Sequence, residues 1–262
     1  MERTSPMTKK LPLASLARTL STALGMLSMG LVLLCTQAAA QELSGQNPIH
    51  AALVSSGPRS SGRIRPTLVY ENQTLLQDLR LYLRDDILLV KGCRFQGAAL
   101  KVRGKGHVIL VNSVFDSPPT LGAMIMVDGR VYIDNVSIFG TGTTPDGNRY
   151  SGLTIHGATQ GGRISNVTVA DFPGNGILLE ASIPITGLNL EHVEIYDCAG
   201  GIWLFNTSGC TVSDLVAFGS NFKSHPKHQQ GNVYPCVLDE RLTGDRRVRS
   251  DTVFDDVVCE PR

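Results

Sequence analysis

The sequence predicts an all-β fold in which short parallel strands stack into a solenoid, and three observations support this. An apolar-x-apolar-x-Asn-apolar-x-apolar pattern recurs irregularly from residue 88 to the C-terminus. The apolar segments are short and alternate with polar residues, and Gly, Asn and Asp separate them instead of helical stretches. The repeat length is mostly 20 to 31 residues. Short strands that repeat in this range are typical of a parallel β-solenoid.

The turn residue of the pattern is its fixed point and is expected to form a column along the stack. Asn and Asp tolerate the left-handed backbone that a sharp bend requires, and a stacked Asn can also hydrogen-bond to the next coil. We therefore expect the column to be structural. Its members, at spacings of 20, 23, 31, 26, 22 and 42, are Gly92, Asn112, Asn135, Asn166, His192, Asp214 and Asp256.

Each coil is expected to hold three short strands. One strand follows the turn residue, and the next strand, which comes after a further loop, is the most regular. Two alternate positions of this strand are aliphatic in every coil, which predicts that they face inward. Stacking of equivalent strands would then pile aliphatic side chains into one continuous core. In the five coils these strands begin at Leu100, Ile125, Leu153, Ile177 and Ile202.

The pattern resembles the right-handed parallel β-helix of the pectate-lyase-like superfamily over about residues 86 to 259. The resemblance implies a single-stranded right-handed β-helix of about six to seven coils, closed by an N-terminal cap. Proteins with this fold include lyases, hydrolases, epimerases and adhesins, so the fold alone does not give the function. In that superfamily, polysaccharides generally lie along an exposed sheet face, and this implies a glycan partner here.

The first 40 residues have the features of a secretory signal peptide. Basic residues precede an apolar run from Leu20 to Leu34, and Ala38-Ala39-Ala40 provides the small residues of a cleavage site. The apolar run is shorter than the roughly 20 residues that span a bilayer. We therefore expect a secreted or periplasmic protein with no transmembrane anchor after cleavage. Residues 41–85 are expected to form an irregular leader and N-terminal cap, and residues 86–262 the β-helix domain.

The cysteines predict a disulfide-stapled C-terminal segment, because an oxidising compartment favours disulfides. Cys198 and Cys210 lie in one coil, and Cys236 and Cys259 bracket the last coil, so both pairs are candidate disulfides. Cys93 lies in an apolar strand and is expected to be a buried free thiol.

The outward positions of the regular strand predict a candidate site. Adjacent coils lie about 4.8 Å apart, so side chains at equivalent positions form ladders. A histidine between two carboxylates would have its pKa raised by both. The first expected ladder is Lys101, Met126, Thr154, Leu178 and Trp203, and the second is Arg103, Asp128, His156, Glu180 and Phe205.

These ladders suggest roles in processing a polysaccharide. His156 would be the general acid or base, Asp128 and Glu180 would tune it or hold a cation, and Arg103 would neutralise a uronate. Calcium is the only cofactor that this arrangement suggests, and the sequence predicts no dedicated metal site. The predicted substrate-binding residues are Lys101, Tyr150, Trp203 and Phe205. The three aromatic residues are included because exposed aromatic rings commonly stack on sugar rings.

A second interpretation stays open, in which the protein is a non-catalytic surface or periplasmic solenoid that binds a protein or glycan. Charge pairs on a solvated sheet stabilise it by a few tenths of a kcal/mol each and need no substrate. Pectate lyases, which the pattern resembles, use calcium-binding acids beside a catalytic arginine, and here only Asp128 and Arg103 approach that arrangement. Of the motifs of polygalacturonases, this sequence has His156-Gly157 but neither acidic motif.

The 24 basic and 23 acidic residues form no basic stripe, which argues against nucleic acid as a partner. The oligomeric state is not predicted.

Overall fold

The computed structural model describes residues 66–220, 232–243 and 246–260, and all regular structure in these ranges is β-strand. The strands form a parallel β-solenoid of about seven turns, as the sequence predicts. They are β1 (Leu68–Glu71), β2 (Thr74–Leu75), β3 (Leu79–Lys91), β4 (Arg94–Gln96), β5 (Leu100–Asp116), β6 (Ala123–Asp128), β7 (Val131–Phe139), β8 (Leu153–His156), β9 (Gln160–Ala170), β10 (Asn175–Tyr196), β11 (Gly200–Ser208), β12 (Thr211–Phe218), β13 (Asn232–Tyr234), β14 (Val237–Thr243), β15 (Arg246–Val248) and β16 (Val253–Glu260).

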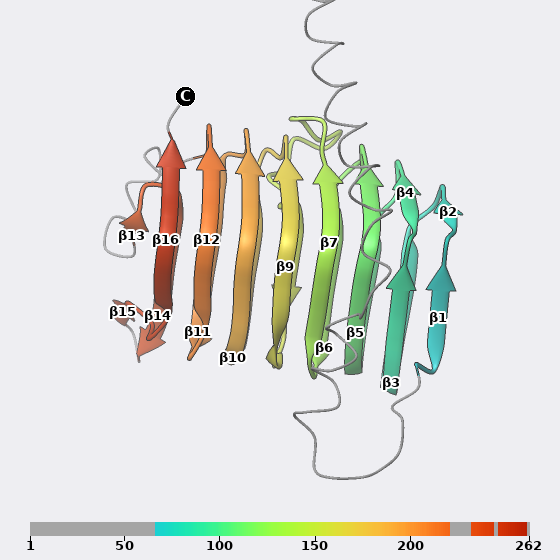
Figure 1. Ribbon diagram of the computed structural model, residues 1–262, viewed down its shortest axis with the longest axis horizontal. Coiled ribbons are helices and arrows are strands. Elements are labelled where there is room, and N and C mark those ends of the chain that lie inside the picture. The colour runs from blue at the N-terminus through green and yellow to red at the C-terminus, as the bar shows by residue number, and fades with distance from the viewer. Residues whose placement is uncertain (1–65, 221–231, 244–245, 261–262) are drawn as a thin grey trace, which may run out of the picture. The chain divides into compact units, whose positions relative to one another are not determined.

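Each coil contributes a segment to each of three parallel sheets, because the long strands bend at the coil corners (Figure 1). Sheet 1 contains the first part of β3 and of β5, then β6, β8, and parts of β10, β11 and β14. Sheet 2 contains β1 and the segments before the turn column, and sheet 3 contains β2, β4 and the segments after it. The expected three strands per coil are therefore present.

The core is a continuous stack of side chains between the three sheets. In sheet 1 one inward ladder is fully buried and entirely aliphatic from the second coil to the sixth, and its members are Val102, Ile125, Ile155, Leu179 and Leu204. In sheet 3 the rings of Phe95 and Phe115 stack with their centroids 4.3 Å apart. Burial of such side chains contributes about 1.5–3 kcal/mol each, so this stack is the main source of stability.

The predicted turn column is confirmed. All seven expected residues have a positive φ, between +47° and +62°, and Asn72 extends the column by one coil. The Asn135 amide donates to the side-chain oxygen of Asn112 at 2.9 Å. Gly92 interrupts the Asn run because a Cβ there would run into the side-chain oxygen of Asn72. A second positive-φ column on the next corner was not predicted, since its residues share no single type: Gly97, Ser117, Asp171, Asp197 and Gly219.

The coils begin earlier than the expected boundary at residue 86. Strand β3 starts at Leu79, within the segment expected to be a cap, and pairs in register with β5 from Leu79 opposite Leu100. Strand β1 pairs in turn with β3, with Leu68 opposite Leu88. Residues 68–85 are therefore part of the solenoid, and their alternating leucines reflect strand periodicity. The predicted signal peptide and most of the leader lie outside the described residues.

One of the two expected disulfides is present. Cys236 and Cys259 are bonded, across a sequence separation of 23 residues. Cys198 and Cys210 are buried free thiols, because the nine-residue strand β11 separates them and places them at different corners of the coil. Burial raises the pKa of Cys198 to about 12, which keeps it protonated and unreactive. Cys93 is also a buried free thiol, as predicted.

A polar cluster closes the last coil, where 42 residues separate two turn residues of the column. The inward ladder of sheet 1 ends with Asp239, which lies opposite Leu204 and is 1% exposed. Its Oδ2 accepts hydrogen bonds from the backbone N–H and the hydroxyl of Ser250, at 3.2 and 3.0 Å. The Ser250 hydroxyl also contacts those of Thr207 and Thr252. This cluster fixes the point at which the chain returns to the stack and begins β16.

Replacement of Asn135 tests the turn column. Asn135→Val should lower the free energy of unfolding by about 1–2 kcal/mol, because a β-branched residue resists a left-handed backbone. Asn135→Gly keeps the conformation and loses only the bond to Asn112, so its effect should be smaller. Urea unfolding followed by circular dichroism measures both, and equal losses would contradict a conformational role.

The buried Asp239 predicts a pH dependence of stability. Desolvation raises its pKa above the ordinary value, although the bonds from Ser250 oppose this. A raised carboxyl pKa means that the folded state retains the proton longer, so stability falls as pH rises from about 4 through the folded-state pKa. Asp239→Asn should therefore gain stability relative to the unmodified chain as pH increases from 4 to 7.

Asp251 provides a control of opposite sign for the same pH series of urea unfolding curves. The N–H of Gly209 donates to its carboxylate at 2.8 Å and lowers its pKa. Stability from Asp251 is thus present at neutral pH and is lost as pH falls through its folded-state pKa. Asp251→Asn should be less stable than the unmodified chain at neutral pH, and this difference should disappear in acid. If the stability difference from the unmodified chain changes with pH in the same direction for Asp239→Asn and Asp251→Asn, the opposite pKa shifts are wrong.

Candidate functional site

The outer face of sheet 1 is the candidate site, because it carries all the predicted catalytic residues and most of the predicted binding residues. Its side chains form ladders along the stack, whose members the strand register gives directly. The first outward ladder is Arg80, Lys101, Met124, Thr154, Leu178, Trp203 and Leu238. The second is Tyr82, Arg103, Met126, His156, Glu180, Phe205 and Glu240. The last members of the two ladders, Leu238 and Glu240 on β14, are buried.

The predicted ladder was wrong at one coil. Met126 lies between Arg103 and His156, and Asp128 lies opposite Lys105 in the adjacent ladder. The strand of this coil begins at Ala123, two residues before the expected start. A shift of two residues preserves the alternation of inward and outward side chains, so the apolar pattern could not distinguish the registers. Arg103, Asp128 and His156 therefore do not form one row.

His156 and Glu180 are neighbours in the ladder, as expected. Nδ1 of His156 hydrogen-bonds to the backbone carbonyl of Glu180, and because a carbonyl only accepts, this bond favours a proton on Nδ1. Nε2 is then the ring atom available for proton transfer. On its other side His156 has Met126 as its ladder neighbour, so the expected pair of flanking carboxylates is absent.

The C-terminal half of the face is apolar and aromatic. Trp203 and Phe205 alternate along one strand, and their rings make an edge contact with centroids 6.3 Å apart. Trp203 has Leu178 as its neighbour in the preceding coil. All three side chains are half-buried. Such a surface can stack against the apolar face of a sugar ring, and the binding role of Trp203 and Phe205 stays a prediction.

The N-terminal half of the face is basic, and we name its centre the cation–tyrosine patch: Tyr82, Arg84, Arg103 and Lys105. Tyr82 lies opposite Arg103, and Arg84 lies opposite Lys105, on two adjacent coils. The four positions form a rectangle of about 5 by 7 Å, from the spacing between strands and between alternate residues. Tyr82 is 70% exposed, and the three cations are also exposed.

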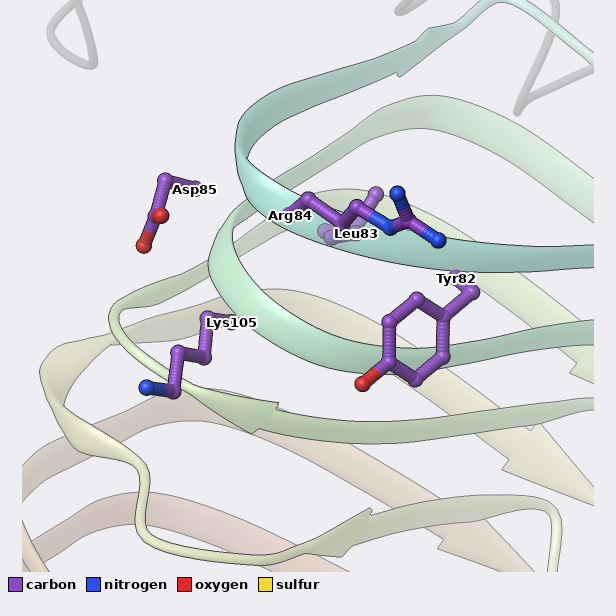
Figure 2. A pocket seen from close by; sticks show the side chains of 5 residues that line it. All are labelled: Tyr82, Leu83, Arg84, Asp85 and Lys105. Atoms are coloured by element: carbon purple, nitrogen blue, oxygen red, sulfur yellow. The ribbon is translucent and has the colours of Figure 1, made fainter.

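Figure 2 shows the hollow beside this patch, which is lined by Tyr82, Leu83, Arg84, Asp85 and Lys105. Its volume is about 450 Å³, and it is open to solvent. The tyrosine ring and the Arg84 side chain lie on one side of the hollow, and Lys105 and Asp85 lie on the other (Figure 2).

The charges of the patch are available to a ligand. Lys101 and Arg80, in the first ladder, both pair with Asp78, at 2.8 and 3.1 Å. In the part of the chain that the structure describes, no ion pair involves Arg84, Arg103 or Lys105. Two carboxylates are close to the patch: Asp85 lines the same hollow, and Asp128 is the ladder neighbour of Lys105. Arg103, with Tyr82 and Met126 as ladder neighbours, has no acidic neighbour in its row.

Sequence reasoning found Lys101 and Arg103 but missed Tyr82, Arg84 and Lys105. The sequence predicts a cap up to residue 85, so the first coil of the face lies outside the predicted ladders. Alternation of Arg80, Tyr82 and Arg84 with Leu79, Leu81 and Leu83 was the signal that could have revealed it.

The loop before β8 contains Tyr150, which was predicted to bind substrate. Its hydroxyl donates to Oδ2 of Asp146 at 2.7 Å, and Asn148 donates to the same oxygen at 2.8 Å. The hydrogen bond from Tyr150 is the largest influence on Asp146 and lowers the pKa of that carboxyl to about 2. The tyrosine hydroxyl therefore stabilises the loop itself.

Metal ligands do not cluster on the face. Within residues 66–220, 232–243 and 246–260, no group of three or more His, Cys, Asp or Glu side chains could hold a metal ion. The same residues contain no helix long and apolar enough to cross a membrane. We therefore assign no chemical step to calcium, the cofactor that the sequence suggested.

The stacked parallel coils, the turn column and the flat outer face define this molecule as a β-helix protein. The family model for the right-handed β-helix region matches residues 81–226, more than half of the chain. The chain therefore belongs to the right-handed β-helix family, consistent with its resemblance to the pectate-lyase-like superfamily. No curated protein and no solved structure matches it.

Proposed function

We propose that this protein is exported and binds an acidic polysaccharide along the outer face of sheet 1. The observation that carries the proposal is the cation–tyrosine patch, in which three exposed cations surround an exposed tyrosine and have no ion-pair partner among the described residues. Guanidinium groups bind carboxylates through paired hydrogen bonds, and a tyrosine ring can stack on a sugar. Uronate or sulfate groups of a glycan fit this combination.

The rest of the face supports a chain-like ligand. From the patch, a polymer could run along the stack past His156 and Glu180 to the apolar surface of Trp203 and Phe205. These positions belong to successive coils, at about 4.8 Å per coil. The patch covers two coils, which suits one or two anionic groups. A nucleic acid would instead require a longer basic track along its phosphates.

Binding without turnover is the function that the geometry supports best. General acid–base catalysis requires a proton donor and acceptor within hydrogen-bond reach of one reacting bond. Met126 separates His156 from Arg103, and Asp128 lies in another ladder beside Lys105. His156 with Glu180 remains the one adjacent pair among the predicted catalytic residues, so His156 is the residue to test for catalysis.

The double variant Arg84→Ala/Arg103→Ala tests the proposed binding. We expect a glycan array to show binding to polyuronates or sulfated glycans, and the variant to weaken it at least tenfold, or about 1.4 kcal/mol. The affinity should also fall as salt is raised, because the charges are exposed. Arg94→Ala is the matched control, since this exposed arginine lies on sheet 3 and pairs with Asp116 at 2.8 Å; it should bind within twofold of the unmodified protein.

Absence of binding to every anionic glycan would overturn the proposal, as would equal loss in the control or tighter binding of an oligonucleotide of matched charge. An ultraviolet assay for unsaturated uronate, applied to any glycan that binds, separates turnover from binding. Turnover that is lost in His156→Ala with binding intact would establish the catalytic alternative. N-terminal sequencing of the exported protein tests cleavage after Ala40.

A further inference from the structure

The last strand of the stack, β16, has an open edge. It pairs with β12 in parallel and with no other described strand, whereas β12 pairs with β10 as well. In sheet 1 the corresponding strand of the last coil, β14, is covered by the antiparallel strands β13 and β15. Consecutive residues of a parallel strand direct their backbone groups to alternate sides. Half of the N–H and C=O groups of β16 therefore face away from β12.

The core is incompletely covered at this edge. Phe254, Val257 and Cys259 point inward but are only partly buried, while their neighbours one coil earlier, Val212, Leu215 and Ala217, are fully buried. On the outer side, Val253 is 61% exposed and Val258 is 41% exposed. An additional strand would bury this apolar surface as well as pair the backbone, and exposed edges of this kind attract other chains.

The open edge is acidic. Asp255, Asp256 and Glu260 lie on β16, and no ion pair joins them to another described residue. His192 of the turn column lies two coils before β16 and contacts Asp214 at 3.1 Å. A partner strand would therefore have to bring positive charges.

The acidic charge also disfavours a second copy of the chain. A copy stacked head to tail with the register continued would place Glu71 against Asp255, because both occupy one ladder of sheet 2. Two copies paired through their β16 strands would bring six carboxylates together. Like charges on adjacent strands destabilise the pairing.

We propose that the free edge of β16 binds a segment of a partner protein as an added β-strand, in which basic and apolar residues alternate on either side of a turn residue that matches Asp256. The backbone of the segment pairs with β16, its apolar side chains cover Phe254 and Val257, and its cations meet Asp255 and Glu260. This site lies on sheets 2 and 3, separate from the glycan face on sheet 1, so it stands or falls independently of the proposed function.

A labelled eight-residue peptide, Lys-Val-Lys-Asn-Val-Lys-Val-Lys, tests the proposal in fluorescence anisotropy with the full-length protein. Its asparagine matches the turn residue Asp256, so its valines face Phe254, Val257 and Cys259 and its lysines face Asp255 and Glu260. We expect binding at low ionic strength. The same peptide with alternate backbone nitrogens methylated keeps its charge but cannot pair as a strand, and it should not bind. The double variant Asp255→Asn/Glu260→Gln should weaken binding of the unmodified peptide about fivefold or more, in line with the modest value of exposed charges.

Glu71→Gln is the matched control, because it removes an exposed carboxylate from the strand at the opposite end of the stack and should leave peptide binding within twofold. Equal binding of the methylated peptide would reduce the effect to general charge attraction and overturn the proposal. Unchanged binding by the double variant would do the same. A dimer in sedimentation that Val258→Lys dissolves would assign the edge to a second copy instead.

Discussion

The left-handed turn residue between sheets 2 and 3 is the constraint on which the rest of this solenoid depends. Each described coil makes this bend at the same position of its path, from Asn72 to Asp256. Because the bend is fixed, the strand segments on either side keep their register with the coils above and below. The aliphatic core columns and the outward ladders both follow from this register. Coils can differ in length only in the loops between other corners, as the long loop before β8 shows.

The sequence was sufficient for the fold and for the turn column because both depend on a repeated local requirement. A positive φ favours Asn, Asp or Gly, and inward strand positions favour aliphatic residues. Each coil therefore shows the same residue pattern, and the pattern can be recognised from the sequence. The second positive-φ corner escaped detection because Ser117 and Gly97 satisfy it as well as Asp171 does. The failed Cys198–Cys210 pairing has a similar origin, since proximity in sequence gives no information on which corner a residue occupies.

The site was harder to predict than the fold, because it depends on absolute register. Inward and outward faces repeat every two residues, so Ala123 and Ile125 were equally acceptable as the first core residue. The difference moved Asp128 from the row of Arg103 to that of Lys105. Similarly, a predicted start of the stack at residue 86 leaves Tyr82 and Arg84 outside the expected ladders. Small errors that leave the fold unchanged therefore redistribute the charges on its surface.

The two ends of the solenoid differ in chemistry, and this gives the molecule a polarity. Basic side chains lie on the first coils of sheet 1, and acidic side chains lie on the last strand of sheets 2 and 3. Interactions through the two regions would thus involve different ligands and different faces, and occupation of one need not obstruct the other. A flat sheet face and an open strand edge are also recognised differently, the first through side chains and the second mainly through the backbone.

The Cys236–Cys259 bond has a mechanical consequence. In a solenoid each coil contacts only its neighbours, so a stretched molecule unravels from an end, one coil at a time. The bond closes the last coil covalently, between the beginning of β14 and the end of β16. A pulling force applied to the two termini would therefore peel the coils away from the N-terminal side first, and the C-terminal coil would remain as the final folded remnant.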